Sequence, residues 1–259
     1  MITGCFNGQK MNIKNVDIIV PSFRSKDLTS LAIKSFEKYR NNFNFRYIVV
    51  ENSQDDGYRD YVCSISNRVI WVQNPIPSLI DSRSPTVRSD ANASGIEKGL
   101  EYAISDYVFI CHNDVVACHA DWMNYLVSKI DEQTPLVGVR EHDDAAHVIG
   151  VLVETKLAKS VSMYPKLNCW DVGDKMTHYC NENGLKYFIC NNTNNNPEAV
   201  NQIKAENYKN VPVDRVLNDD GDVIYMHLGR GTDKQFNKYF KRGKLFIPSW
   251  KEFINESVL

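Results

Sequence analysis

The segment DYVFICHNDVVA, residues 106–117, places a polar tip directly after an apolar run. Its YVFIC portion is apolar throughout and contains β-branched and aromatic residues, which is typical of a strand buried on both faces. His112, Asn113 and Asp114 follow at once, before the chain becomes apolar again. A buried strand carries ionisable side chains at its tip only where the fold or the chemistry needs them. The segment therefore predicts a core strand whose polar carboxyl end must be explained by the fold or by the chemistry.

The chain around this segment, over residues 16–130, alternates strand-like and helix-like patterns. Short apolar, β-branched runs predict three strands, at residues 16–21, 45–53 and 68–74. Apolar residues at helical spacing predict three helices, at residues 25–39, 94–105 and 119–130. Ser25 or Asp27 is available to cap the first helix, and the Pro-, Ser- and Asp-rich stretch 75–93 reads as a loop. This alternation indicates an α/β fold with a mostly parallel central sheet flanked by helices.

The carboxyl ends of three predicted strands are polar. Ser22 follows the first strand, Glu51 lies near the end of the second, and residues 112–114 follow the fourth. Ligands of open α/β sheets bind in the crevice beyond the carboxyl ends of the strands. We therefore expect these three separated positions to line one cleft.

The second half of the chain has a different pattern. Residues 148–153 predict a strand, and residues 171–184 predict a capped helix that ends near Gly184 and leads into another strand. The asparagine-rich stretch 191–202 reads as a mobile loop. Residues 222–228 predict an apolar strand that runs into a basic stretch.

Composition bounds the class of protein. The 259 residues contain 30 Lys and Arg against 32 Asp and Glu, so no global charge points to nucleic acid or to an anionic membrane. The sequence shows no apolar run long enough for a membrane span and no signal-peptide pattern. Its seven cysteines lack paired spacing, which fits reduced thiols. A soluble, cytoplasmic protein is expected.

His112 and Asp114 are two residues apart, so in an extended chain both side chains can point toward one cavity. Imidazole and carboxylate suit Mg²⁺ or Mn²⁺ beside a diphosphate. Taken alone, the pattern is more typical of a polar loop in which Asp114 caps a turn. Cys111 and Cys118, with His112 and His119, do not have the ligand pairs of a zinc site.

The order of motifs over residues 16–232 resembles the family-2-like glycosyltransferases with the GT-A fold. IVPSF resembles the family's first strand end, and VVENSQDDG resembles its acidic second strand end. ASGIEKGLEYAISDYVFICHNDVVACHADWMNYL resembles the helix, strand, Asp-x-Asp element and following helix. WDVGDKMTHYCNENGLK and YMHLGRGT resemble the family's later acidic helix and its histidine turn.

The resemblance implies a role for each matching residue. It implies metal ligands at three positions: Asp114, His112 and His227. It implies nucleotide-sugar contacts at eight positions: Pro21, Ser22, Phe23, Glu51, Arg88, Asp90, Asn113 and Arg230. Arg88 and Asp90 fit an exposed ion pair equally well. The general base of an inverting transfer would be Asp171 or Asp174, and Asp174 also stands where an N-cap is useful.

Two departures from the family pattern bear on the metal. His112 replaces the first Asp of the Asp-x-Asp element, and Glu51 replaces an Asp. Imidazole still coordinates Mn²⁺, but the exchange removes a charge and favours borderline metals. His147, before the strand at 148–153, faces the acceptor or is a hydrogen-bonded structural histidine.

The expectation is a single GT-A-type domain over residues 12–259, after a leader at 1–11. It comprises a Rossmann-like nucleotide-sugar half (12–135) and an acceptor and metal-completing half (136–259). The resemblance implies an inverting, metal-assisted transfer from a nucleoside diphosphate sugar, first of all a UDP-sugar, to a hydroxyl acceptor in glycan or surface-polysaccharide assembly. The alternatives are a catalytically silent nucleotide-sugar-binding protein and a nucleotidyltransferase, for which PSFRSKDL is a poor phosphate loop.

Overall fold

The computed structural model describes residues 13–54, 57–76, 85–140, 145–165, 171–194, 196–229, 245 and 247–259, without the side chains of 85–88. Its strands are β1 (Asn15–Ser22), β2 (Asn44–Glu51), β3 (Val69–Gln73), β4 (Tyr107–Ile110), β5 (Val115–Ala117), β6 (Leu136–Arg140), β7 (Ala146–Glu154), β8 (Phe188–Asn192), β9 (Asp214–Leu217) and β10 (Val223–His227). Its helices are α1 (Lys26–Lys38), α2 (Arg59–Ile65), α3 (Pro85–Tyr102), α4 (Trp122–Ser128), α5 (Thr155–Ser160), α6 (Asp174–Glu182), the 3-10 helix η2 (Pro197–Gln202), α7 (Glu206–Lys209) and α9 (Ile247–Ser257).

The described strands form one sheet in the order β3-β2-β1-β4-β7-β6-β8-β9-β10-β5. β3, β2, β1 and β4 are parallel, so their carboxyl ends share one edge, and β6 is parallel to β8. The other pairings are antiparallel. The α/β architecture is thus as expected, but the parallel part lies mainly in the first half and the whole sheet is mixed.

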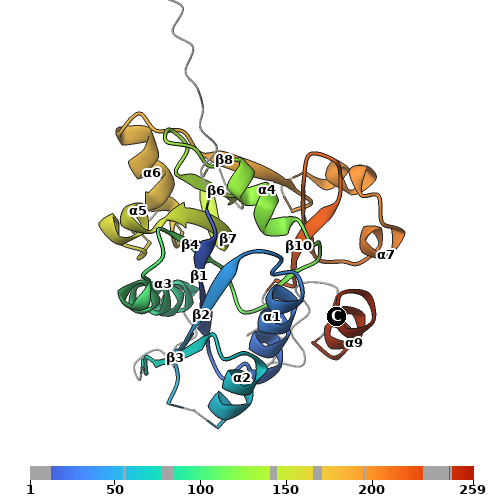
Figure 1. Ribbon diagram of the computed structural model, residues 1–259, viewed down its shortest axis with the longest axis horizontal. Coiled ribbons are helices and arrows are strands. Elements are labelled where there is room, and N and C mark those ends of the chain that lie inside the picture. Colours follow the sequence, from blue (N-terminus) through green and yellow to red (C-terminus); the bar gives the residue numbers. More distant parts are fainter. Residues whose placement is uncertain are drawn as a thin grey trace, which may run out of the picture.

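Helices cover both faces of this sheet (Figure 1). Alternate residues of β1 point to opposite cores: Ile18 packs with Phe36 of α1 and Trp122 of α4, whereas Ile19 packs with Ile96 of α3. A third core gathers residues of α1, β5, β10 and α9 around Trp250. Each buried strand is therefore apolar on both sides, which is why the strands read as continuous apolar runs.

Two glycines let α3 lie very close to the sheet. A Cβ on Gly99 would stand 2.5 Å from Cγ2 of Ile19, and one on Gly95 would stand 2.9 Å from Nδ2 of Asn52. α3 therefore packs directly on the carboxyl ends of β1 and β2. The helix begins at Pro85, so the expectation of a loop through residue 93 was wrong. Proline suits the first helical position because that residue needs no backbone donor.

Local corrections also arise in the second half. The asparagine-rich stretch expected to be a mobile loop contains the end of β8 and all of η2. The N-cap of α6 is Gly173, with φ of +87°, so Asp174 is the first helical residue rather than the cap. Gly184 follows α6 with φ of +66°, which confirms the expected helix end.

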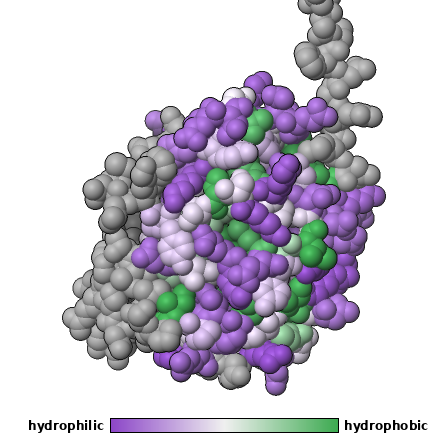
Figure 2. Space-filling view, turned by 90° about the vertical axis from the view of Figure 1, so that its left-hand side faces the viewer, coloured by the Kyte–Doolittle hydropathy of each residue, from purple (hydrophilic) through white to green (hydrophobic). Residues whose placement is uncertain are grey.

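The surface seen in Figure 2 is mostly hydrophilic, and its hydrophobic residues gather in small separate patches. Among the described residues, no helix combines the length and the apolar character needed to cross a bilayer.

Candidate functional site

β4 delivers the polar tip to the edge of the sheet. The backbone N–H of Cys111 donates to the carbonyl of Ile19 at 3.1 Å and extends the β4–β1 pairing by one residue. The chain then turns, with the N–H of Val115 donating to the carbonyl of His112 at 3.3 Å. His112 and Asp114 therefore occupy a tight turn between two buried strands.

β10 brings His227 to the same turn. β10 and β5 are antiparallel, and their register places His227 opposite Val115. The N–H of Leu228 then donates to the carbonyl of Asp114 at 3.1 Å. Backbone pairing therefore fixes the position of His227 beside Asp114.

The three side chains expected to bind metal converge. Nε2 of His227 lies 3.3 Å from Oδ1 of Asp114 and 3.3 Å from Nδ1 of His112. One ligand atom from each residue lies within 4.8 Å of the others. Asp114 and His227 are buried, and His112 is half-buried. Two imidazole nitrogens and one carboxylate oxygen suit a divalent ion of the Mn²⁺ to Zn²⁺ series, so the residues fit such an ion.

Further groups contact the far sides of both imidazoles. Nδ1 of His227 lies 3.2 Å from Oδ2 of Asp214, the first residue of β9. Nε2 of His112 lies 3.1 Å from the side-chain amide of Asn92, on α3. Burial opposes the charged form of His227, but the carboxylates of Asp114 and Asp214 raise its pKa to about 10. Without a cation, His227 therefore carries a positive charge between two carboxylates.

A histidine–carboxylate pair lies beside this cluster. β7 is antiparallel to β4, so its amino end is at the same edge, and the rings of His147 and His112 are 5.7 Å apart. Nε2 of His147 lies 3.3 Å from Oδ2 of Asp171, and Nδ1 accepts the N–H of Ile149 at 3.3 Å. The accepted bond at Nδ1 leaves the proton of a neutral ring on Nε2, the nitrogen that faces the Asp171 carboxylate.

The two aspartates expected to provide a base differ in their surroundings. The hydrogen bond from His147 holds the pKa of Asp171 well below its usual range, and its side chain is 39% exposed. Asp174 accepts the N–H of Asp171 at 2.7 Å, and burial raises its pKa. Asp171 is thus an ionised, accessible carboxylate, whereas Asp174 shapes the start of α6.

Glu51 is held by internal donors. Its side chain is fully buried, and Oε1 accepts the N–H groups of Arg24 and Ser53, each at 3.0 Å. Oε2 accepts the hydroxyl of Tyr58. The Tyr58 hydroxyl also lies 2.9 Å from Oγ of Ser22. Glu51 therefore organises the loop after β1, and the sequence could not reveal this because Arg24, at the start of that loop, is separated from Glu51 by 27 residues.

The other expected nucleotide contacts lie in different situations. Pro21 is buried against α3, and Phe23 is half-buried with the guanidinium of Arg24 at 5.5 Å from its ring centroid. Asp90 is half-buried on α3. Asn113 is 5% exposed, and its Nδ2 has no hydrogen-bond partner among the described residues. A buried amide donor of this kind is suited to a ligand oxygen. Two expected contacts lie outside the described parts: the side chain of Arg88 and all of Arg230.

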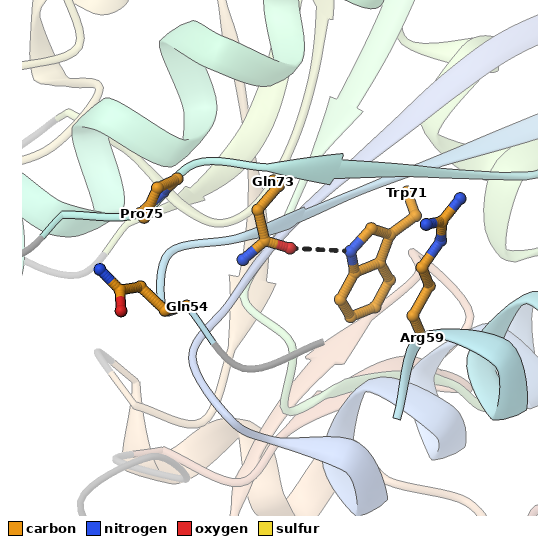
Figure 3. A pocket seen from close by; sticks show the side chains of 5 residues that line it. All are labelled: Gln54, Arg59, Trp71, Gln73 and Pro75. Carbon is orange, nitrogen blue, oxygen red and sulfur yellow. Dashed lines mark hydrogen bonds between the residues drawn. The ribbon is translucent and has the colours of Figure 1, made fainter. Parts of the chain in front are cut away.

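A separate hollow lies beyond the edge strand β3 (Figure 3). It has a volume of about 370 Å³, and its lining residues are Gln54, Arg59, Trp71, Gln73 and Pro75. Nε1 of Trp71 donates to Oε1 of Gln73 at 3.1 Å, which fixes the wall of the hollow (Figure 3). None of the expected nucleotide contacts that the structure describes lines it.

No family model and no curated protein sequence matches the chain. Solved structures do resemble it. A mannosyltransferase from Pyrobaculum calidifontis, solved with GDP-Man and Mn²⁺, has a TM-score of 0.55 and 12% identity over 70% of this chain and 56% of its own. TarS residues 1–349 from S. aureus give a TM-score of 0.43 and 14% identity over 63% and 53%. UDP-bound glucosyl-3-phosphoglycerate synthase from Mycobacterium tuberculosis gives 0.40 and 13% over 56% and 58%.

The first of these similarities carries the fold assignment, because its TM-score exceeds 0.5. The chain spans little more than half of the mannosyltransferase, 56%. The expected GT-A-type fold is therefore confirmed.

Proposed function

We propose that the protein is a glycosyltransferase that moves a sugar from a nucleoside diphosphate sugar to an acceptor hydroxyl. The observation that carries this proposal is the convergence of His112, Asp114 and His227 at the carboxyl end of β4 in a GT-A-type fold. Ligands of such sheets bind at this edge. The solved mannosyltransferase of similar fold contains GDP-Man and Mn²⁺, which agrees with a donor and an ion of this class.

The donor lies across the carboxyl ends of β1, β2 and β4 in this proposal. In it, Pro21, Ser22 and Phe23 form the floor of the nucleotide site. Glu51 does not contact the donor but holds the loop after β1 through its hydrogen bonds. The Asn113 amide donates to a ligand oxygen. A bound Mn²⁺ or Mg²⁺ would neutralise the diphosphate as it leaves. UDP-sugar and GDP-sugar are the donors to test first.

Asp171 is the proposed general base. An inverting transfer needs a carboxylate that takes the acceptor proton on the face opposite the leaving diphosphate. Asp171 is partly exposed, ionised and oriented by His147. Asp174, in contrast, bonds to the backbone of Asp171, so its role is to hold that loop.

The setting of the reaction is also a proposal. We place it in the cytoplasm, in glycan or surface-polysaccharide assembly, with residues 12–259 acting as one domain. Residues 12–135 would bind the donor, and residues 136–259 would bind the acceptor and complete the metal centre.

Calorimetry against a panel of UDP- and GDP-sugars, with and without Mn²⁺, tests this function, followed by detection of released nucleotide and glycosylated product. Asp114→Ala should abolish metal-dependent donor binding. Asp219→Ala is the matched control, since this 66%-exposed carboxylate contacts only Lys129 and Tyr125 among its described partners. Full turnover by Asp114→Ala would refute the assignment of the centre. Donor binding without hydrolysis or transfer to any acceptor would instead indicate a catalytically silent nucleotide-sugar-binding protein.

A further inference from the structure

The imidazoles of His112 and His227 each contact a polar side chain on another element through the ring nitrogen that does not face the other imidazole. Asp214 contacts Nδ1 of His227 from β9, and Asn92 contacts Nε2 of His112 from α3. Neither residue belongs to the set of three converging ligands. Metal-binding histidines are commonly oriented in this way, by a carboxylate or carbonyl oxygen on the nitrogen that does not bind the ion.

For His227, the geometry assigns each nitrogen a role. Nδ1 lies 3.2 Å from a carboxylate that can only accept, so Nδ1 carries the proton. Nε2 points toward Asp114 and His112, at 3.3 Å from each ligand atom. His227 thus presents Nε2 to the ion, with Asp214 fixing the plane of the ring.

For His112, the same reasoning assigns the opposite nitrogens. Nδ1 faces His227, so a ligand lone pair on Nδ1 requires the proton on Nε2. The Asn92 atom that lies 3.1 Å from Nε2 is Nδ2, a donor. Half a turn of this amide about its Cβ–Cγ bond exchanges Nδ2 for Oδ1 and supplies the acceptor that Nε2–H needs.

We propose that Asn92 and Asp214 are positioning residues of the metal centre, which hold Nδ1 of His112 and Nε2 of His227 toward Asp114. This inference deepens the proposed function and rests on it. The centre is then a set of two nitrogens and one carboxylate whose ligand atoms are oriented before the ion arrives. Asn92 reaches His112 because Gly95, three residues further along α3, lets the helix approach the strand ends.

Metal binding in the absence of any sugar nucleotide tests the proposal. Mn²⁺ affinity is measured by electron paramagnetic resonance, and the Co²⁺ absorption spectrum reports the coordination geometry. Asn92→Ala and Asp214→Ala should each weaken Mn²⁺ binding about 10- to 100-fold and change the Co²⁺ spectrum. Asn92→Asp should bind Mn²⁺ at least as well as the wild type, because a carboxylate accepts from Nε2–H in either orientation.

Asn74→Ala is the matched control. The Asn74 amide also ties α3 to the sheet, through Ser94 and Asn52, but it contacts no imidazole in the described part of the chain. Its Mn²⁺ affinity should equal that of the wild type, and a loss as large as that of Asn92→Ala would overturn the role of Asn92. Equal weakening by Asn92→Asp and Asn92→Ala would also overturn it, since the amide would then be a donor to His112.

Failure of the inference and failure of the proposed function give different results. A wild-type protein that binds Mn²⁺, together with unchanged affinity in Asn92→Ala or Asp214→Ala, removes that residue from the proposal and leaves the metal centre intact. A wild-type protein that binds neither Mn²⁺ nor Co²⁺ removes the centre itself, and the positioning proposal with it.

Discussion

Replacing Asp171 by Asn removes the proposed general base while keeping the shape of the side chain. The amide oxygen can still accept the N–H of Val172, which now lies 2.7 Å from Oδ1. The amide nitrogen meets the N–H of His147, because Nδ1 of that ring already accepts from Ile149. The variant therefore loses one hydrogen bond and the ability to take a proton.

The two losses affect different quantities. One hydrogen bond to a charged group contributes about 1.5–3 kcal/mol to stability, and the value here lies at the lower end because Asp171 is partly exposed. General base catalysis contributes about 10²- to 10⁴-fold in rate, or about 3–5 kcal/mol in the activation barrier. Donor affinity should stay the same, because Asp171 lies on the acceptor side of the cluster in the proposed arrangement.

The assay compares kcat at saturating donor and Mn²⁺ with the donor Kd from calorimetry. We expect Asp171→Asn to lower kcat at least about 100-fold at an unchanged Kd. Asp174→Asn is the control, since its amide oxygen can still accept the N–H of Asp171. The reasoning is refuted if Asp171→Asn keeps kcat within a few-fold of wild type, and loss of turnover in Asp174→Asn alone would assign the base to that residue.

Three other outcomes are expected. His112→Asp should lower the ratio of the Mg²⁺ Kd to the Co²⁺ Kd by roughly tenfold or more, measured by competition titration, because an oxygen ligand replaces a nitrogen; an unchanged ratio would show that His112 is not a ligand. Gly99→Ala should lower the free energy of unfolding by about 1–3 kcal/mol in urea titration, because its Cβ would stand 2.5 Å from Ile19; equal stability would contradict the close packing of α3. In EDTA, the pKa of His227 lies above its ordinary value of 6.5, at about 10, so its contribution to stability is complete below about pH 6.5 and is lost as the pH rises toward 10. The unfolding midpoint should fall over that range in the wild type and fall less in His227→Gln, and parallel curves would be the contrary result.

The sequence predicts the first half of the fold well because its signals are local. β1, β2, β3 and β4 are short and mainly apolar, and α1 has a clear helical period. The start of α3 was missed because Ser, Asp and Asn favour loops by composition, although they lie here on a helix that begins with a proline.

The site was predictable only in part, because some of its residues are brought together by tertiary packing and not by local sequence. His112 and Asp114 lie two residues apart at the end of one predicted strand, and His227 ends another recognisable strand. Asp214 and Asn92 carry no sequence signal, because their function depends on which strand lies beside β10 and on how closely α3 approaches β4. The role of His147 stays open from the sequence, because only the antiparallel pairing of β7 with β4 brings its ring to the cluster.

The contact between His112 and His227 closes a loop of 115 residues. On the ribosome, the first half can emerge and form its parallel strands long before His227 has been synthesised. A nascent chain that ends before His227 therefore cannot bind the ion with all three ligands. The ion therefore binds late in folding and links β10 to the amino-terminal half, which is already folded. The entropy of closing so long a loop has by then already been lost through strand pairing. Metal retention by a stalled or truncated chain would accordingly report how far folding has advanced.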